Sequence, residues 1–340
     1  MSFAIIDAAA GGEAGTGGSV GRSRYSTPIA NLPLIFHVFD ELAAAGIDRL
    51  HVIVSAGARE ELERVLSGGS RWGVEVSYTT AAAPGGRLAA LAELERVVVD
   101  EPVLVYPGDC LFPGQVSAMW ERFNAGDVDA VVLGAGNGER RRGLSAPVEF
   151  SRRVTSVPAI VGRPGAPVID GLRNAGVDRH DLAAWLRASD YRVAVCEPGG
   201  SWCYSDDTED LLIANRMMLD ALPVPAVDGS FGVDNVVDGR VAISSTARLS
   251  GCVLHGPVAV DDGAVIEDSY VGPYTAVGAG AILIGAEIDN TMVLAGAEIT
   301  HPGQRIEGSI IGERASVVRS FALPRGLHMR LEPQSRVTLS

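Results

Sequence analysis

Apolar residues in positions 1–222 form short continuous runs that alternate with stretches of helical spacing. Runs such as 3–6 and 103–106 are apolar throughout, which is typical of parallel strands buried on both faces. The expected strands are 3–6, 50–56, 74–78, 103–106, 129–135 and 192–197, and the expected helices are 33–45, 58–66, 87–98 and 207–220. This alternation predicts an α/β domain with a doubly wound, mostly parallel, Rossmann-like sheet over residues 1–222.

The hydrophobic spacing changes after residue 240. Every sixth residue is then aliphatic or alanine, at positions 241, 247, 253, 259, 265, 271, 277 and 283. A six-residue period is typical of a left-handed parallel β-helix, in which three hexads make one triangular coil. Ile299, Ile306, Ile310 and Val317 suggest further, less regular coils. We therefore predict a linker over 223–240 and a β-helix of hexapeptide repeats over 241–340.

The charge balance excludes two classes of partner. The 340-residue chain has 42 acidic residues against 28 basic ones, every basic residue is arginine, and the formal net charge is −14. Because no basic stripe follows any predicted element, we expect neither nucleic acid nor an anionic membrane as a partner. A hydrophobic fraction of 47% with 21% charged residues is that of a soluble globular protein.

The cysteines and the lack of a targeting segment indicate a compartment. Cys110, Cys196, Cys203 and Cys252 form no CxxC pair and have no metal-ligand spacing with histidine. We therefore expect free thiols in a reducing compartment. The sequence has neither a signal peptide nor an apolar run of about 18 residues. These features predict a cytoplasmic protein.

Several segments carry a resemblance to a known family. A Gly-rich loop, AAAGGEAGTGG (8–18), follows the first expected strand and precedes PIANLPL (28–34). Three further matches are YPGDCLF (106–112), WCYSDDTEDLLIANRMML (202–219) and EDSYVGPYTAVG (267–278). Together they resemble the sugar-1-phosphate nucleotidyltransferases. The domain order resembles that of the longer bacterial glucose-1-phosphate thymidylyltransferases, which have a nucleotidyltransferase domain before a left-handed β-helix.

This resemblance implies a reaction and a set of site residues. In the family, an oxygen of a sugar 1-phosphate attacks the α-phosphorus of a nucleoside triphosphate and expels pyrophosphate, while Mg²⁺ and basic residues neutralise charge. By resemblance, Asp109 at a strand end would bind Mg²⁺, and Arg24 and Arg163 would replace catalytic lysines. The substrate-binding residues implied in the same way are Gly11, Gly12, Gly15, Gly86, Asp170 and Gly171.

The chain departs from the family pattern at most of its charged positions. Ala14, beside Glu13, lies where the loop arginine is expected, and Tyr204 lies where a second Mg²⁺-binding aspartate is expected. The carboxylates at 206–207 are close enough in sequence to replace it. At the position that reads the base, Ala81 offers no amide. Because removal of one preorganised charge typically lowers a rate about 10²–10³-fold, these losses together predict that nucleotidyl transfer is lost or strongly altered.

Three hypotheses stay open at this point. In the first, the chain is a non-catalytic or regulatory protein of nucleotide-sugar metabolism, in a deoxysugar or natural-product setting, that binds a nucleotidyltransferase paralogue or forms a homo-oligomer. In the second, it is an active Mg²⁺-dependent enzyme that makes an NDP-sugar or NDP-cyclitol from a sugar phosphate and a nucleoside triphosphate. In the third, the former pocket acts on another phosphorylated small molecule.

Overall fold

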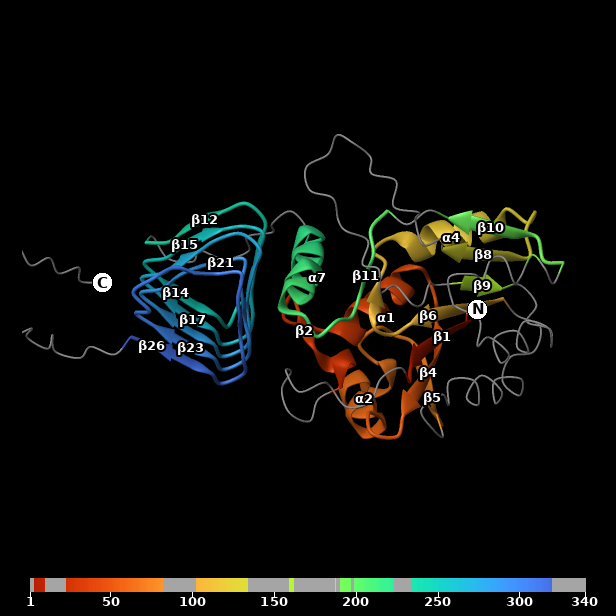
Figure 1. The fold of residues 1–340 in the computed structure, drawn as a ribbon, viewed down its shortest axis with the longest axis horizontal. Helices are drawn as coiled ribbons and strands as arrows, with labels where there is room; N and C mark the ends of the chain where they lie inside the picture. Colours follow the sequence, from red (N-terminus) through yellow and green to blue (C-terminus); the bar gives the residue numbers. More distant parts are fainter. Residues whose placement is uncertain are drawn as a thin grey trace, which may run out of the picture.

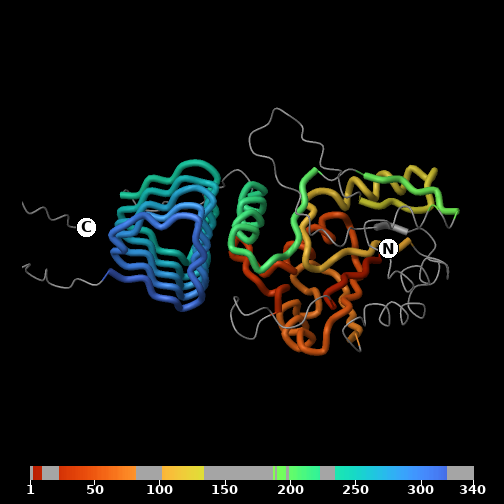
Figure 2. The backbone as a smooth tube through the Cα atoms, in the orientation of Figure 1, coloured from red at the N-terminus to blue at the C-terminus, as the bar shows by residue number. Residues whose placement is uncertain are grey.

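The computed structural model shows two folded parts side by side along the long axis of the molecule (Figure 1). The residues that it describes are 3–9, 23–81, 102–133, 159–161, 187, 190–196, 199–222 and 234–319. One part is an α/β domain and the other is a stack of triangular coils, most clearly followed in the trace of Figure 2. Helix α7 (Thr208–Asp220) lies between the two parts.

Seven strands form the central sheet of the α/β domain, in the order β10-β8-β9-β6-β1-β4-β5. Their bounds are β1 Phe3–Ala8, β4 Arg49–Ser55, β5 Glu75–Ala81, β6 Val103–Pro107, β8 Ala130–Leu133, β9 Ala159–Val161 and β10 Val193–Cys196. All neighbours pair in parallel except β9, which is antiparallel to both β6 and β8. The predicted Rossmann-like, mostly parallel sheet is therefore confirmed, and β9 is a strand that the sequence pattern did not reveal.

In the described part of the domain, three helices pack against one face of this sheet. They are α1 (Leu34–Ala44), α2 (Arg59–Leu66) and α4 (Gln115–Asn124), of which α4 was not predicted. Their buried side chains, among them Phe39 and Met119, form one cluster with strand residues such as Ile6. Gly46 has a φ of 79° and follows the end of α1, as its position in the sequence predicts. In the part of the chain that the structure describes, no helix is long and apolar enough to cross a membrane.

A tight turn of the α/β domain contacts the coils of the second part. Strands β2 (Pro28–Ile29) and β3 (Leu32–Pro33) pair in antiparallel around Ala30 and Asn31, whose φ angles are 46° and 69°. Positive φ at both central residues is the geometry of a type I′ hairpin turn. The Asn31 side chain extends from this turn, and its Nδ2 donates to the carbonyl oxygens of Ala259 and Val277 at 3.2 and 3.0 Å.

His37 of α1 supports this turn from inside the domain and should make stability depend on pH. It is buried, and its Nε2 lies 2.8 Å from the carbonyl oxygen of Ile29. Burial lowers the pKa of His37 below its ordinary value of 6.5. The contribution of neutral His37 to the free energy of unfolding is therefore fully present above the unfolded-state pKa of 6.5. It is lost as the pH falls through the lower pKa of the folded state. We expect a slope of up to about 1.4 kcal/mol per pH unit in that window. Urea unfolding between pH 7.5 and 5 should show it in the wild type, and a His37→Gln variant with the same slope would contradict this assignment.

The second part is a left-handed parallel β-helix, as predicted. Each of its three faces is a five-stranded parallel sheet. The first face consists of β12 Val236–Asp238, β15 Val253–His255, β18 Tyr270–Val271, β21 Glu287–Asp289 and β24 Ile306–Glu307. The second consists of β13 Val241–Ile243, β16 Val258–Val260, β19 Thr275–Val277, β22 Met292–Val293 and β25 Ile310–Ile311. The third consists of β14 Arg248–Ser250, β17 Val265–Glu267, β20 Ile282–Ile284, β23 Glu298–Thr300 and β26 Ser316–Val318. Strand β12 lies inside the range predicted as a linker.

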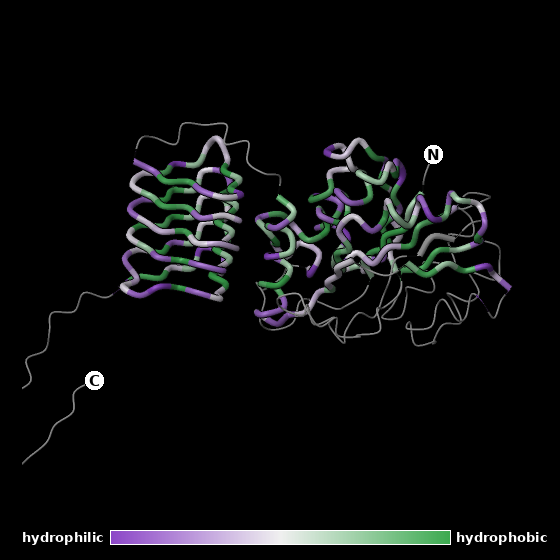
Figure 3. Tube along the Cα trace, turned by 90° about the horizontal axis from the view of Figure 1, so that it is seen from above, coloured by the Kyte–Doolittle hydropathy of each residue, from purple (hydrophilic) through white to green (hydrophobic). Residues whose placement is uncertain are grey.

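The six-residue series of the sequence does not follow the inward positions along the whole β-helix. Val237 pairs with Leu254 and Leu254 with Val271, so these coils advance by 17 residues, one fewer than three full hexads. The inward positions therefore shift against the six-residue series. Val253 and Val265 belong to that series, but neither is part of the buried core. The core contains the residues on either side of them, Cys252, Leu254, Ala264 and Ile266. Figure 3 shows hydrophobic and hydrophilic residues alternating along the coils.

Helix α7 joins the β-helix to the α/β domain through one buried contact surface. The apolar residues that share it are Ile29, Leu34, Leu111, Trp202, Leu212, Ala214 and Met292. Within it, Asn215 is completely buried; its Oδ1 accepts from the Ala30 N–H and its Nδ2 donates to the Tyr274 carbonyl oxygen, both at 3.0 Å. A single amide side chain therefore satisfies backbone groups of both parts.

Candidate functional site

The carboxyl ends of β1 and β6 meet at one edge of the sheet, where open α/β sheets bind ligands. Asp7 pairs with Pro107, and the Gly108 N–H donates to the Asp7 carbonyl oxygen at 2.9 Å. A Cβ atom on Gly108 would lie 3.0 Å from Ile6 Cγ2 and 3.1 Å from that carbonyl oxygen. The close approach of the two strands therefore favours glycine here. Asp109 follows directly and lies at this edge.

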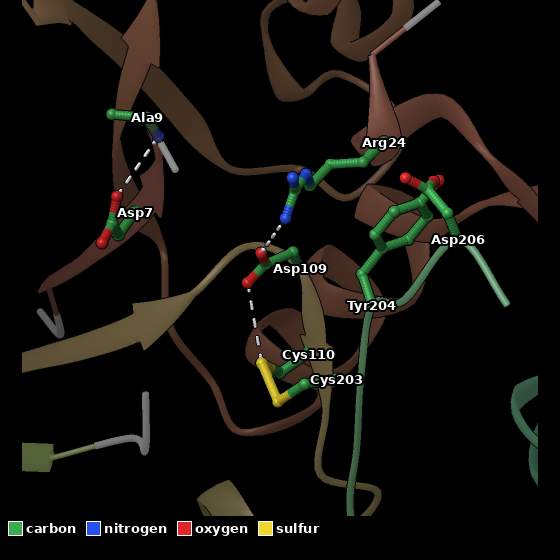
Figure 4. A network of polar contacts seen from close by, with 8 residues as sticks. All are labelled: Asp7, Ala9, Arg24, Asp109, Cys110, Cys203, Tyr204 and Asp206. Carbon is green, nitrogen blue, oxygen red and sulfur yellow. Dashed lines mark hydrogen bonds and ion pairs between the residues drawn. A yellow bond between two sulfur atoms is a disulfide. The ribbon is translucent and has the colours of Figure 1, made fainter. Parts of the chain in front are cut away.

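Asp109 forms an ion pair with Arg24 (Figure 4). Arg24 Nη1 lies 3.2 Å from Asp109 Oδ2, and the two side chains are 26% and 14% exposed. Arg24 begins the 3₁₀ helix η1 (Arg24–Ser26), and Tyr25 anchors this helix in the core. Burial raises the pKa of Asp109, and the Arg24 guanidinium opposes that shift. The structure thus brings together Asp109, the predicted metal ligand, and Arg24, a predicted catalytic residue. The two form an ion pair with each other.

The ring of Tyr204 packs against the Arg24 guanidinium. Arg24 Cζ lies 5.1 Å from the centroid of the ring, within the range of a cation–π interaction. The Tyr204 hydroxyl donates to Asp206 Oδ1 at 2.5 Å. Burial, followed by this hydrogen bond to Asp206, raises the pKa of the Tyr204 phenol, which is therefore neutral near pH 7. The guanidinium is thus in contact with both a carboxylate and an aromatic ring.

A disulfide joins Cys110 to Cys203 beside these residues. The two cysteines pair directly across the antiparallel strands β7 (Cys110–Leu111) and β11 (Trp202–Cys203). The prediction of four free thiols is therefore wrong for this pair and correct for Cys196 and Cys252. Spacing rules find cysteines that are close in sequence, whereas these two are 93 residues apart and meet only through the pairing of β7 with β11.

The side chains at this edge do not fit the Mg²⁺ ion that the resemblance implies. Mg²⁺ takes carboxylate and water oxygens in octahedral geometry, but the Asp109 carboxylate is paired with Arg24, and Tyr204 offers only a neutral phenol. The nearby carboxylates are also engaged. Asp206 accepts the Tyr204 hydroxyl, and Asp207 caps α7 by accepting an N–H of its first turn at 2.9 Å. Among the described residues, no group of three or more histidine, cysteine or acidic side chains is arranged to hold a metal ion.

Asp7 is a residue of this edge that the sequence analysis missed. It is the one charged residue of strand β1, FAIIDA, and is 7% exposed. Its Oδ1 accepts from the Ala9 N–H at 3.2 Å, and Figure 4 shows it in the same region as Asp109. Burial of a carboxylate is costly. The interruption of an apolar strand by one acidic residue is the sequence feature from which Asp7 could have been identified.

The remaining predicted site residues lie outside the described residues. They are Gly11, Gly12, Gly15, Gly86, Arg163, Asp170 and Gly171. Their roles stay predictions.

Comparison with known proteins agrees with the resemblance. A family profile described as nucleotidyl transferase matches residues 20–143. The chain is 28% identical over 335 residues to a glucose-1-phosphate thymidylyltransferase of Streptomyces antibioticus, and the alignment covers 92% of each chain. It is 25% identical over 331 residues to the glucose-1-phosphate thymidylyltransferase of Streptomyces griseus, again over 92% of each chain. It is also 29% identical over 337 residues to a low-salt glycan biosynthesis nucleotidyltransferase of Haloferax volcanii, with 92% of this chain and 93% of the relative covered.

These matches extend through both folded parts, and the parallel sheet, the β-helix and their order agree with them. The nucleotidyl transferase domain and these relatives together support placing the chain in the sugar-1-phosphate nucleotidyltransferase family.

Proposed function

We propose that this protein does not catalyse Mg²⁺-dependent nucleotidyl transfer and acts as a non-catalytic partner in nucleotide-sugar metabolism. The observation that carries the proposal is the ion pair of Arg24 with Asp109 beside the ring of Tyr204. By resemblance, these three positions would provide a basic group for the phosphates and two carboxylates for the metal. Here the basic group is paired with the carboxylate that remains at these three positions, so the guanidinium is not free for a phosphate and the carboxylate is not free for a metal ion.

The charges at this edge of the sheet also disfavour a triphosphate. The described groups include the carboxylates of Asp7, Asp109 and Asp206 and one guanidinium, that of Arg24. Two unit charges about 4 Å apart interact by about 4 kcal/mol at an effective dielectric constant of 20. Transfer of a phosphorus centre depends mainly on positioning and on neutralisation of negative charge. An excess of carboxylates therefore acts against both binding and turnover.

A partner role is supported by the parts of the fold that lie away from this edge. The β-helix is joined to the α/β domain by a buried apolar cluster and by Asn215. Domains of stacked coils present extended binding surfaces. Because the relatives that match along most of the chain include two thymidylyltransferases, we infer that the partner is an active nucleotidyltransferase paralogue or a second copy of this chain.

Thermal unfolding in the presence of each common NTP and dNTP, with and without Mg²⁺, tests the loss of metal-dependent binding. We expect no Mg²⁺-dependent shift of the melting temperature for the wild type. The double variant Arg24→Ala/Tyr204→Asp removes the cation that is paired with Asp109 and supplies a second carboxylate. We expect it to gain binding of Mn²⁺, measured by water-proton relaxation. Addition of Asp109→Asn to this variant is the matched control and should abolish the gained binding.

A different outcome would support one of the alternatives. A ligand at 100 times its Kd adds about 2.7 kcal/mol to stability, which is readily measured. Mg²⁺-dependent stabilisation of the wild type by one nucleotide, lost in Asp109→Ala, would overturn the proposal and support an active nucleotidyltransferase. Stabilisation by a phosphorylated small molecule without Mg²⁺ would support the third hypothesis, in which the former pocket acts on another phosphorylated small molecule. The partner itself is sought by native mass spectrometry of the chain mixed with a family paralogue.

A further inference from the structure

The disulfide lies between the two chain segments that carry the site's contacts (Figure 4). Asp109 immediately precedes Cys110, and Tyr204 immediately follows Cys203. Beside the disulfide, the Tyr204 N–H donates to the Asp109 carbonyl oxygen at 2.8 Å. The covalent bond therefore holds the backbone of Tyr204 against the backbone of Asp109.

Backbone pairing of the two strands contributes little to holding these segments together. Strands β7 and β11 have two residues each, and even a complete two-stranded hairpin is only marginally stable in water. Trp202 anchors the start of β11, because it is buried and its Nε1 donates to the Asp210 carbonyl oxygen at 2.8 Å. Tyr204, by contrast, is half-buried, and Asp206 is exposed. Loss of the disulfide thus loosens the segment after Trp202 more than Trp202 itself.

Reduction also adds a competing hydrogen-bond donor at Asp109. Cys110 Sγ lies 3.6 Å from Asp109 Oδ1. A disulfide sulfur carries no proton, whereas a thiol is a weak donor. After reduction, Cys110 can therefore donate to the same carboxylate that binds Arg24 through Oδ2. The thiol and the guanidinium would then share one carboxylate.

We propose that Cys110 and Cys203 form a reversible redox pair that controls access to the Arg24 guanidinium. In the disulfide state, the ring of Tyr204 and the carboxylate of Asp109 cover the guanidinium. In the dithiol state, the segment that carries Tyr204 opens, and Arg24 is free to bind an anionic group. This proposal stands whether or not the protein has lost nucleotidyl transfer.

The exchange requires a dithiol as reductant, either a small molecule or a dithiol protein. One of its thiolates attacks the sulfur of Cys203, the more exposed cysteine at 8% against 2% for Cys110. A mixed disulfide forms, and Cys110 leaves as a thiolate and takes up a proton. The second thiol of the reductant then displaces Cys203, which is protonated in turn. Two electrons and two protons pass to the pair, and the reductant leaves as its own disulfide.

Arginine labelling of the folded protein tests the proposal. Oxidised wild type and wild type reduced with dithiothreitol, then desalted without air, are treated with phenylglyoxal, and the modification of Arg24 is followed by mass spectrometry. Iodoacetamide labelling confirms the redox state. We expect Arg24 to react about tenfold faster after reduction, because local opening exposes it. Arg59, whose side chain is hydrogen-bonded to Glu63 and Thr80, is the internal reference and should keep its rate. Reoxidation should restore the slow labelling of Arg24.

Three variants separate local opening from a general loss of stability. Cys110→Ala/Cys203→Ala should label fast at Arg24 with or without dithiothreitol. Cys196→Ala removes a free cysteine and should keep the full redox response. Val131→Ala removes buried contacts of strand β8 while the disulfide stays intact, so its oxidised form should still label slowly at Arg24.

Two results would overturn the proposal. One is an equal rate of Arg24 labelling in oxidised and reduced wild type that are both folded by circular dichroism. The other is a disulfide that dithiothreitol reduces only when the domain is unfolded in urea, because the bond would then be a fixed cross-link.

Discussion

Replacement of Cys110 and Cys203 together by alanine is expected to lower the free energy of unfolding of the α/β domain by about 4 kcal/mol. The disulfide joins residues 93 positions apart, and a cross-link that closes a loop of this length removes much conformational entropy from the unfolded chain. For a domain of this size, the loss corresponds to a decrease of about 10 °C in melting temperature. Urea unfolding at pH 7, followed by circular dichroism, measures it. Addition of dithiothreitol should produce a similar loss in the wild type and none in the variant.

Cys196→Ala is the matched control for this measurement. Cys196 is a free, half-buried cysteine of the same domain, so its replacement should change the free energy of unfolding by about 0.5 kcal/mol or less. A loss of under about 1 kcal/mol in the double variant would be below the usual range for a native disulfide. It would contradict an important role of the cross-link in the stability of the fold.

Replacement of Asn215 by leucine is expected to cost about 3 kcal/mol of unfolding free energy. Leucine has the same branching and the same number of non-hydrogen side-chain atoms as asparagine, but both hydrogen bonds of the buried amide are lost. The N–H of Ala30 and the carbonyl oxygen of Tyr274 are then left unsatisfied in the contact between the two folded parts, and each such group costs about 1–3 kcal/mol. Urea unfolding of the full chain measures the loss. We also expect the β2–β3 turn to become accessible to proteases, because the Ala30 N–H no longer fixes it.

Arg216→Met is the matched control on the same helix. The guanidinium of Arg216 donates to Asn290 Oδ1 at 3.1 Å across the same contact, but the side chain is only half-buried. Water can replace this hydrogen bond, so we expect a loss of about 1 kcal/mol or less. Equal effects of the two variants would mean that burial of the Asn215 amide is not the cause of the larger loss.

Asn215 and the Cys110–Cys203 disulfide both act on segments that also position the candidate site. The β2–β3 turn, which Asn215 and Asn31 hold against the β-helix, follows the 3₁₀ helix that carries Arg24. The disulfide holds the segments of Asp109 and Tyr204 on the other side of the same guanidinium. Stability and the arrangement of the site are therefore coupled through short stretches of chain.

The sequence pattern predicted the elements of the sheet well, because burial on both faces leaves continuous apolar runs that can be read locally. It missed β9 and α4, and the short pairs β2–β3 and β7–β11, whose strands of two residues are too brief to show a period. It also predicted the β-helix, but the six-residue series alone does not identify all the inward positions, because a coil of 17 residues shifts against a period of six.

For the site, the sequence by itself determined which chemical groups are present. The absence of lysine is a property of the composition. Asp109 after a buried strand and Tyr204 in place of an aspartate are properties of single positions. Only the tertiary structure decided what these groups do to one another. Arg24 and Asp109 are 85 positions apart, and Cys110 and Cys203 are 93 apart. Contacts between such distant residues depend on which strand ends lie together at the edge of the sheet. A local pattern of residues does not contain this information.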